Sequence, residues 1–128
     1  QKNIDYPTDF ATTVNNISML YSAIGKYDLA KKRLLDVKEF YYKEHGENHA
    51  LILLNLVSIE LTNGIFDAQV IEKNLLQALT IVKNKNQTNA LLYGQITYHL
   101  GWFYRDINNQ SQSEEYFLET QRFFTIIT

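Results

Sequence analysis

The sequence predicts an all-α fold of six helices, arranged as about three consecutive helix hairpins in one domain. Apolar residues recur at steps of three and four along most of the 128 residues, which is the period of a helix with one buried face. The same pattern of helix, short turn and helix repeats around Gly25, Gly64 and Asn108, which lie 39 and 44 residues apart. No segment of useful length alternates polar and apolar residues as a strand would. The three hairpins are predicted over residues 8–45, 48–84 and 89–127.

The first hairpin begins after the single Pro of the chain. Thr8 and Asp9 are candidate caps of its first helix, because their side chains can accept hydrogen bonds from backbone N–H groups. Gly25 follows this helix, where a left-handed residue is favoured, and a second helix is expected over 28–44. The predicted inward residues of the two helices are Phe10, Val14, Ile17, Leu20, Tyr21 and Ile24, then Leu34, Val37 and Tyr41.

The second hairpin has a helix expected over 48–62, which Asn63 and Gly64 end, and a helix expected over 67–83. The predicted inward residues of the latter are Val70, Leu75, Leu79 and Val82. Residues 84–89 are predicted to form a polar loop, because they contain no apolar side chain.

The third hairpin has helices expected over 90–106 and 111–127, separated by a turn at Asn108. Ser111 and Glu114 have the S-x-x-E spacing of a capping box, in which each side chain accepts a hydrogen bond from the other residue's backbone N–H. Glu114 and Glu115 are expected in the first turn, where negative charge complements the helix dipole.

The composition excludes several classes of function. The net charge is −2, from 12 basic and 14 acidic residues, whereas a dedicated nucleic-acid binder would carry a basic patch. There is no Cys, which excludes disulfides and thiolate metal sites. No apolar run approaches the roughly 18 residues of a membrane span. No phosphate-binding glycine loop or nucleophile–base pattern is present, so neither a cofactor nor an enzymatic activity is predicted.

The chain does not begin with Met, and it is expected to be a segment of a longer protein.

Residues 8–127 resemble the tetratricopeptide repeat family. That family has a Leu-Gly or Leu-Ala pair in the first helix of each repeat, then a Tyr, a turn Gly, an aromatic residue and an Ala. The first segment matches at Ile17-Ser18, Tyr21, Gly25, Tyr27 and Ala30, and the third at Leu100-Gly101 and Tyr104, with Ser113 in place of Ala. The second departs most, with Glu60 in place of Tyr and Ala68 one residue early.

The first segment is most similar to the longer repeats of kinesin light chain, through Asn15-Asn16, residues 25–30 and residues 45–49. The resemblance implies that the hairpins stack into an α–α superhelix, or solenoid, whose concave face binds a protein or peptide. Similar repeats also accompany caspase-like protease domains and nucleotide-switch domains in bacterial proteins. The alternative function is therefore a regulatory or sensor module that controls such an attached effector domain.

The resemblance also implies which residues line the binding face. By register these are Thr12, Asn15, Met19, Ser22, Leu51, Leu54, Ser58, Leu61, Gln95, Tyr98, Trp102 and Arg105. The best candidates for peptide binding are Asn15, Met19, Leu54, Ser58, Tyr98, Trp102 and Arg105, because Tyr, Trp and Arg most often carry interface energy. Tyr98 and Trp102 could instead pack between repeats, and Asn16 is expected to tie neighbouring helices together.

Two further features have open interpretations. His45 and His49 flank Gly46 in a predicted loop, which could bind a metal but is more simply a polar loop; no metal site is predicted. The last helix is apolar on more than one face, whereas a terminal repeat needs a polar outer face for solubility. Phe123, Phe124 and Ile127 are therefore predicted to contact a further repeat, an adjoining domain or a second copy of the chain.

Overall fold

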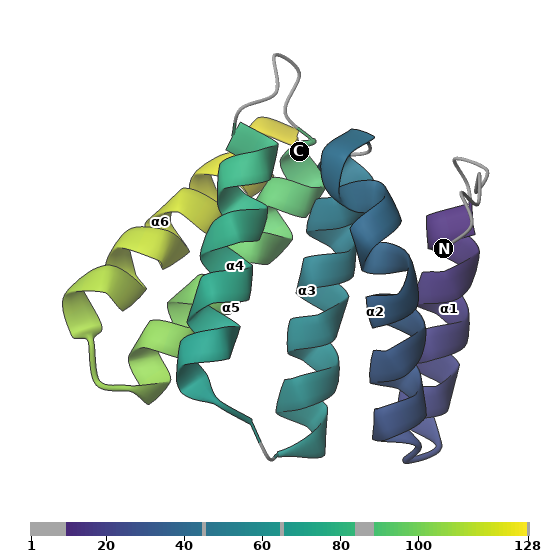
Figure 1. The fold of residues 1–128 in the computed structure, drawn as a ribbon. Helices are drawn as coiled ribbons and strands as arrows, with labels where there is room; N and C mark the ends of the chain where they lie inside the picture. The colour runs from purple at the N-terminus through teal and green to yellow at the C-terminus, as the bar shows by residue number, and fades with distance from the viewer. Residues whose placement is uncertain (1–9, 45, 65, 84–88, 128) are drawn as a thin grey trace. The chain divides into compact units, whose positions relative to one another are not determined.

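The structure is a computed structural model that describes residues 10–44, 46–64, 66–83 and 89–127. Within these ranges the chain forms six α-helices and no strand, which confirms the predicted all-α class (Figure 1). The helices are α1 (Phe10–Ala23), α2 (Tyr27–Glu44), α3 (Gly46–Asn63), α4 (Ala68–Lys83), α5 (Ala90–Asp106) and α6 (Gln110–Ile127). None of them, over the ranges described, is long and apolar enough to cross a membrane. The predicted caps Thr8 and Asp9, and His45, lie outside the described residues.

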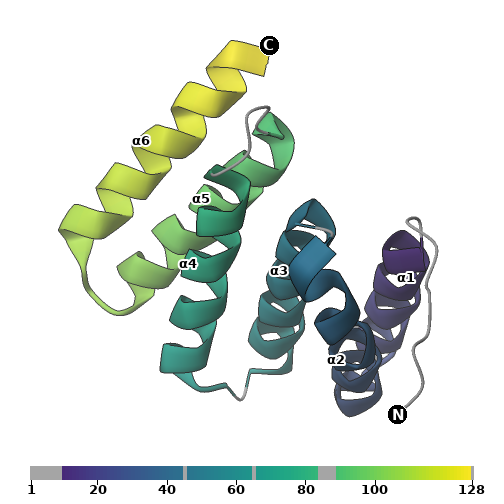
Figure 2. The same ribbon diagram turned by 45° about the horizontal axis from the view of Figure 1, so that its top comes forward.

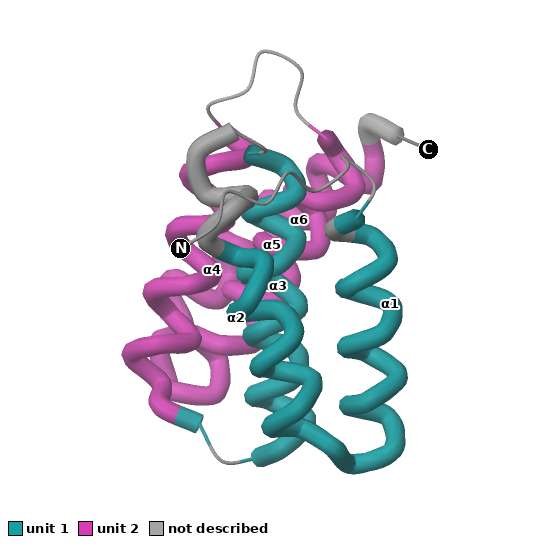
Figure 3. Tube along the Cα trace, turned by 45° about the vertical axis from the view of Figure 1, so that its right-hand side comes forward, with its two compact units in different colours: residues 1–66 teal, residues 67–128 magenta. Residues whose placement is uncertain are grey.

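The chain divides into two compact units, residues 1–66 and residues 67–128 (Figure 3). The first unit contains α1, α2 and α3, and the second contains α4, α5 and α6. The boundary falls between α3 and α4, so the two helices of the predicted middle hairpin belong to different units. The stacking of three hairpins into a solenoid therefore stays a prediction.

In the first unit, all three helices pack against one another, and their apolar side chains share one core. The core includes Leu34 and Val37 of α2, as predicted, and is formed by Val14, Ala30, Leu34, Val37, Ile52, Leu56 and Ile59. At its edge, the Lys31 ammonium of α2 donates to the Glu60 carboxylate of α3, with Nζ and Oε2 3.2 Å apart.

Part of the predicted apolar face of α1 is not covered. Val14 is buried, but Ile17, Leu20 and Ile24 are exposed. The reason is that α2 and α3 cover one side of α1 only (Figure 2).

In the second unit, α5 packs against both α4 and α6. The buried residues of α4 include Leu75, Leu79 and Val82, as predicted, whereas Val70 is exposed and does not point inward. Ser113 of α6 donates from its Oγ to the carbonyl oxygen of Gly101 of α5 over 2.9 Å. This hydrogen bond satisfies the buried hydroxyl where the two helices are close.

The three predicted turn residues are all left-handed. The φ angles are +84° at Gly25, +83° at Gly64 and +64° at Asn108. The turns after α1 and α5 end the helix in the same way: the backbone N–H of Lys26 donates to Tyr21 O, and that of Asn109 donates to Tyr104 O, each over 2.8 Å.

Two local predictions about α6 are wrong. The cap of α6 is Asn109, whose Oδ1 accepts from the backbone N–H of Gln112 over 3.2 Å, so the predicted capping box at Ser111 and Glu114 is not formed. Neither Glu114 nor Glu115 lies in the first turn of α6. In the middle segment Ala68 is exposed, and Ile71 takes the buried place that Ala30 has in α2. A longer connection after Gly64 causes this shift, with Asp67 Oδ1 accepting from the backbone N–H of Gln69 over 2.9 Å.

Candidate functional site

An exposed stripe of aromatic and cationic side chains follows the surface of α5. Tyr98, Trp102 and Arg105 are separated by four and three residues, so they share one face of the helix. The exposed fractions of Tyr98 and Trp102 are 47% and 41%. These are three of the predicted peptide-binding residues, and we call them the α5 stripe.

Contacts between its members order the α5 stripe. The Arg105 guanidinium carbon lies 5.0 Å from the centre of the Trp102 ring, which is a cation–π contact. The rings of Tyr98 and Trp102 meet edge to face at 6.3 Å. Phe117 of α6 lies beside both, 6.2 Å from the Tyr98 ring and 5.6 Å from the Trp102 ring. The stripe is therefore supported by a second helix, which lowers the entropy that its side chains would lose on binding.

The other four predicted binding residues belong to the first unit and do not form a comparable surface. Met19 is exposed and Ser58 is half-buried. Asn15 and Leu54 are buried, which corrects the prediction that these two present their side chains to a partner. Neither polar atom of the Asn15 side chain has a hydrogen-bond partner. Asn16 is exposed, contrary to its predicted role as a tie between helices.

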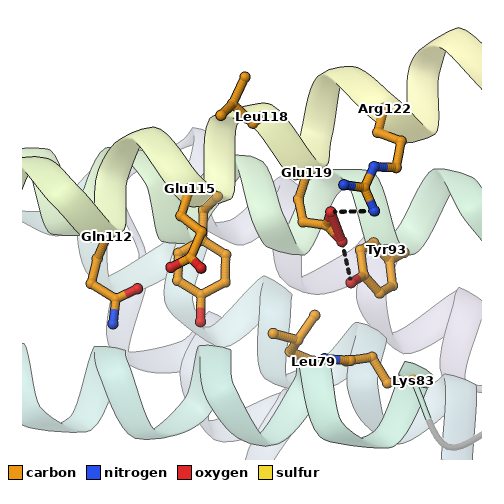
Figure 4. Close-up of a pocket in the computed structure, with 9 residues that line it drawn as sticks. Leu79, Lys83, Tyr93, Gln112, Glu115, Leu118, Glu119 and Arg122 are labelled. Carbon is orange, nitrogen blue, oxygen red and sulfur yellow. Dashed lines mark hydrogen bonds and ion pairs between the residues drawn. The ribbon is translucent and has the colours of Figure 1, made fainter.

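A pocket of about 500 Å³ opens in the second unit, beside α4, α5 and α6 (Figure 4). Its lining residues are Leu79, Lys83, Tyr93, Gln112, Glu115, Tyr116, Leu118, Glu119 and Arg122. Two of these side chains are basic and two acidic, so the pocket does not favour a ligand of one charge.

Glu119 is engaged by two neighbours at the edge of this pocket. The Tyr93 hydroxyl donates to Glu119 Oε2 over 3.1 Å, and Arg122 Nη1 lies 3.2 Å from Glu119 Oε1 (Figure 4). Burial, followed by the hydrogen bond to the Glu119 carboxylate, raises the pKa of Tyr93 to about 12. The phenol is therefore a hydrogen-bond donor at neutral pH and not a base.

A second tyrosine–carboxylate pair joins α5 to α4. The Tyr104 hydroxyl donates to Glu72 Oε2 over 2.6 Å, and the Tyr104 ring stacks on Tyr116 with centres 5.7 Å apart. Burial and this hydrogen bond raise the pKa of Tyr104 well above its usual range. Burial and the nearby carboxylates of Glu115 and Glu72 raise the pKa of Tyr116 in the same direction.

The residues that line the pocket include no Ser, His or Cys. Among the described residues, no group of three or more potential ligands is arranged to hold a metal ion. His49 lies buried within α3 rather than in the predicted loop, and His99 Nδ1 lies 2.8 Å from the carbonyl oxygen of Gln95.

Two of the three predicted interface residues of the last helix contact other residues of the second unit. Phe123 is half-buried and stacks on Tyr93, with ring centres 4.0 Å apart. Phe124 is exposed but lies against Gly94 of α5. The side chain of Ile127 lies outside the described part of the chain.

The sequence interpretation did not single out the residues around Glu119. The spacing of Glu119 and Arg122, three residues apart on one helix, is a recognisable signal of an ion pair. The partner Tyr93 lies 26 residues from Glu119 and could be assigned only once the packing of α5 against α6 was known.

Comparison with known proteins gives no family and no relative. No protein-family model matches the chain, and no similar protein was found among the curated proteins or the solved structures.

Proposed function

We propose that this chain is a helical-repeat binding module, without enzymatic activity, that binds a protein or peptide through the α5 stripe. The observation that carries the proposal is the exposure of Tyr98 and Trp102 beside Arg105 on one helix face. Large aromatic residues of a monomeric domain are normally buried, and Tyr, Trp and Arg together are the residue types most enriched at binding hot spots.

The chemistry of the stripe defines the kind of partner. Two aromatic faces offer apolar contact area, and the Arg105 guanidinium keeps free N–H donors at its edge while it lies over the Trp102 ring. The fitting partner is a peptide or helix with apolar side chains and an acidic group or carbonyl oxygen next to them. The resemblance to tetratricopeptide repeats supports the same assignment, since it implies a protein or peptide ligand.

The test uses Trp102, the only Trp of the chain, as a built-in reporter of the stripe. A library of peptides that pair apolar residues with acidic residues is titrated into the full chain, and the emission of Trp102 is followed. The expected result is a saturable change in emission for some peptides, with affinity reduced at least tenfold by Tyr98→Ala and by Arg105→Ala, as expected of hot-spot residues.

The matched control is Leu118→Ala, which removes an exposed apolar side chain of α6 that has no ring contact with the stripe. It should leave the peptide affinity unchanged. Peptides that bind the stripe variants as tightly as the unmodified chain would show that binding occurs elsewhere.

A further inference from the structure

A polar contact between α2 and α3 and one between α4 and α5 follow the same rule of position. Lys31, one residue after buried Ala30, pairs with Glu60 of the next helix over 3.2 Å. Glu72, one residue after buried Ile71, accepts from Tyr104 of the next helix over 2.6 Å. Glu60 and Tyr104 both lie four residues before the left-handed residue that ends their helix. A polar pair thus forms at the same two positions where α2 meets α3 and where α4 meets α5.

When the same rule is applied to α6 and α1, it identifies one carboxylate residue in α6 and one tyrosine in α1. Glu114 of α6 follows buried Ser113 by one residue, and Tyr21 of α1 lies four residues before left-handed Gly25. The side chains of Glu114 and Tyr21 have no hydrogen-bond or ion-pair partner among the described residues. They are a carboxylate and a phenol, which is the same chemical pair as Glu72 and Tyr104.

The apolar residues near Tyr21 on α1 correspond by register to those by which α3 packs on α2. Leu56 and Ile59 of α3 pack into the core formed with α2. Their counterparts by register in α5, Leu100 and Phe103, are also buried. The counterparts in α1 are Ile17 and Leu20, which are exposed, and the exposed fraction of Leu20 is 68%. The face of α1 that corresponds to the one by which α3 packs on α2 is therefore exposed at Ile17 and Leu20, while Tyr21 beside them packs against the core of the first unit.

Among the described residues, no helix packs on α5 and α6 in the way that α3 packs on α1 and α2. In the first unit α3 packs on both α1 and α2, and Asn15 and Ser22 of α1 are buried. Their counterparts in α5 are Tyr98 and Arg105, which are exposed. The face of α5 and α6 on which a following helix would pack is therefore uncovered.

We propose that α1 of a second copy of this chain packs on α5 and α6, in the way that α3 packs on α1 and α2. The Tyr21 hydroxyl then donates to the Glu114 carboxylate, and Ile17 and Leu20 cover apolar surface beside the α5 stripe. This inference rests on the proposed function, since it takes the stripe to be a binding surface and names one partner for it. We assign the site to this occupant because α1 supplies both an exposed apolar face and a phenol whose hydroxyl can donate to Glu114.

The contact joins two different surfaces, so it is heterologous and builds either a closed ring or an open filament. A contact between two identical surfaces would stop at the dimer.

Sedimentation velocity of the full chain over a wide concentration range tests the proposal. The variant Leu20→Glu disrupts the proposed surface of α1, and the variant Tyr98→Glu disrupts that of α5. Both place charge on exposed positions, so each should remain folded by circular dichroism. Leu20→Glu retains only the surface of α5 and α6, and Tyr98→Glu retains only the surface of α1. Because neither variant alone has both surfaces, each is expected to be monomeric. An equimolar mixture of the two is expected to restore a complex of two 15.0 kDa chains and nothing larger.

The control variant is Leu118→Glu, since Leu118 and its counterpart Leu35 in the covered first hairpin are both exposed. It is expected to assemble as the unmodified chain does. Tyr21→Phe and Glu114→Gln should each weaken association about tenfold, as for loss of a hydrogen bond to a charged group, and the double variant should weaken it no further than either single one.

Two results would overturn the proposal: an unmodified chain that stays monomeric at all concentrations, or failure of the mixed variants to associate. The peptide titration repeated in the monomeric Leu20→Glu variant separates this inference from the proposed function. Peptide binding without self-association would remove the second copy as partner and leave the binding module standing. Self-association without peptide binding would restrict the stripe to copies of the chain.

Discussion

At the scale of single residues, Gly101 shows how closely α5 and α6 pack. A Cβ atom at Gly101 would lie 2.5 Å from a ring carbon of Phe117, which is inside van der Waals contact. Resemblance to the repeat family could predict a small residue here, because Gly101 occupies the Gly or Ala position of the motif. The sequence could not predict that the neighbouring ring is Phe117, nor that this ring supports Tyr98 and Trp102.

We expect Gly101→Ala to lower the free energy of unfolding by about 1–3 kcal/mol, because overpacking costs more than the gain of about 1 kcal/mol in helix propensity. Urea denaturation followed by circular dichroism measures the change. Gly94→Ala is the matched control, since a Cβ there would lie 3.3 Å from the tip of the Phe124 ring and needs only a small shift. Equal stability of the two variants would contradict this account.

At the scale of elements, periodicity predicted the helices well and their starts less well. The predicted range 90–106 coincides with α5, because a polar segment precedes it and a left-handed Asn follows it closely. The start of α6 was wrong, because Asn109 and Ser111 both have side chains that can cap a helix and the sequence does not rank them. Which residues of α4 point inward depends on the length of the connection after Gly64. A change in this length moves the buried face of the helix without changing the apolar period. The buried Asn15 was predicted at the surface because the register does not show which side of α1 the other helices cover.

Substitutions at the helix caps of α5 and α6 test these assignments directly. Asn89 Oδ1 accepts from the backbone N–H of Leu92 over 3.0 Å at the start of α5. We expect Asn89→Ala to lower the free energy of unfolding by about 1 kcal/mol. Ser111→Ala should change it by less than about 0.5 kcal/mol, because Ser111 is an exposed residue within α6. Thermal unfolding of the two variants checks both values, and a larger loss for Ser111→Ala would restore the predicted capping box.

At the scale of the whole molecule, the described tyrosines whose pKa is raised all lie in one part of the chain. Tyr93, Tyr104 and Tyr116 all belong to the second unit, where burial and neighbouring carboxylates stabilise their neutral form. The high aromatic content was evident from the sequence, but these pairings depend on contacts between α4, α5 and α6. They could not be predicted without the helix register.

The stability of the chain should therefore fall in alkali. The pKa of Tyr93 is about 12 in the folded chain, against about 10 for an unfolded tyrosine, so the folded chain binds more protons between these values. Its contribution is complete below about pH 10 and is lost as the pH rises towards about 12. Thermal unfolding across this range should show a decline that is shallower in Tyr93→Phe. An unchanged slope in that variant would mean that Tyr93 does not titrate as described.

The packing partners within each unit have a consequence for folding kinetics. The packed pairs are α1 with α2, α2 with α3 and α1 with α3 in one unit, and α4 with α5 and α5 with α6 in the other. Every pair joins helices that are neighbours or next neighbours along the chain, so few long loops must close before favourable contacts form. Proteins rich in such local contacts fold in microseconds to milliseconds. Each core can thus form as soon as its own three helices have been synthesised, which shortens the time that Leu34 and the other buried apolar side chains spend exposed in an unfolded chain.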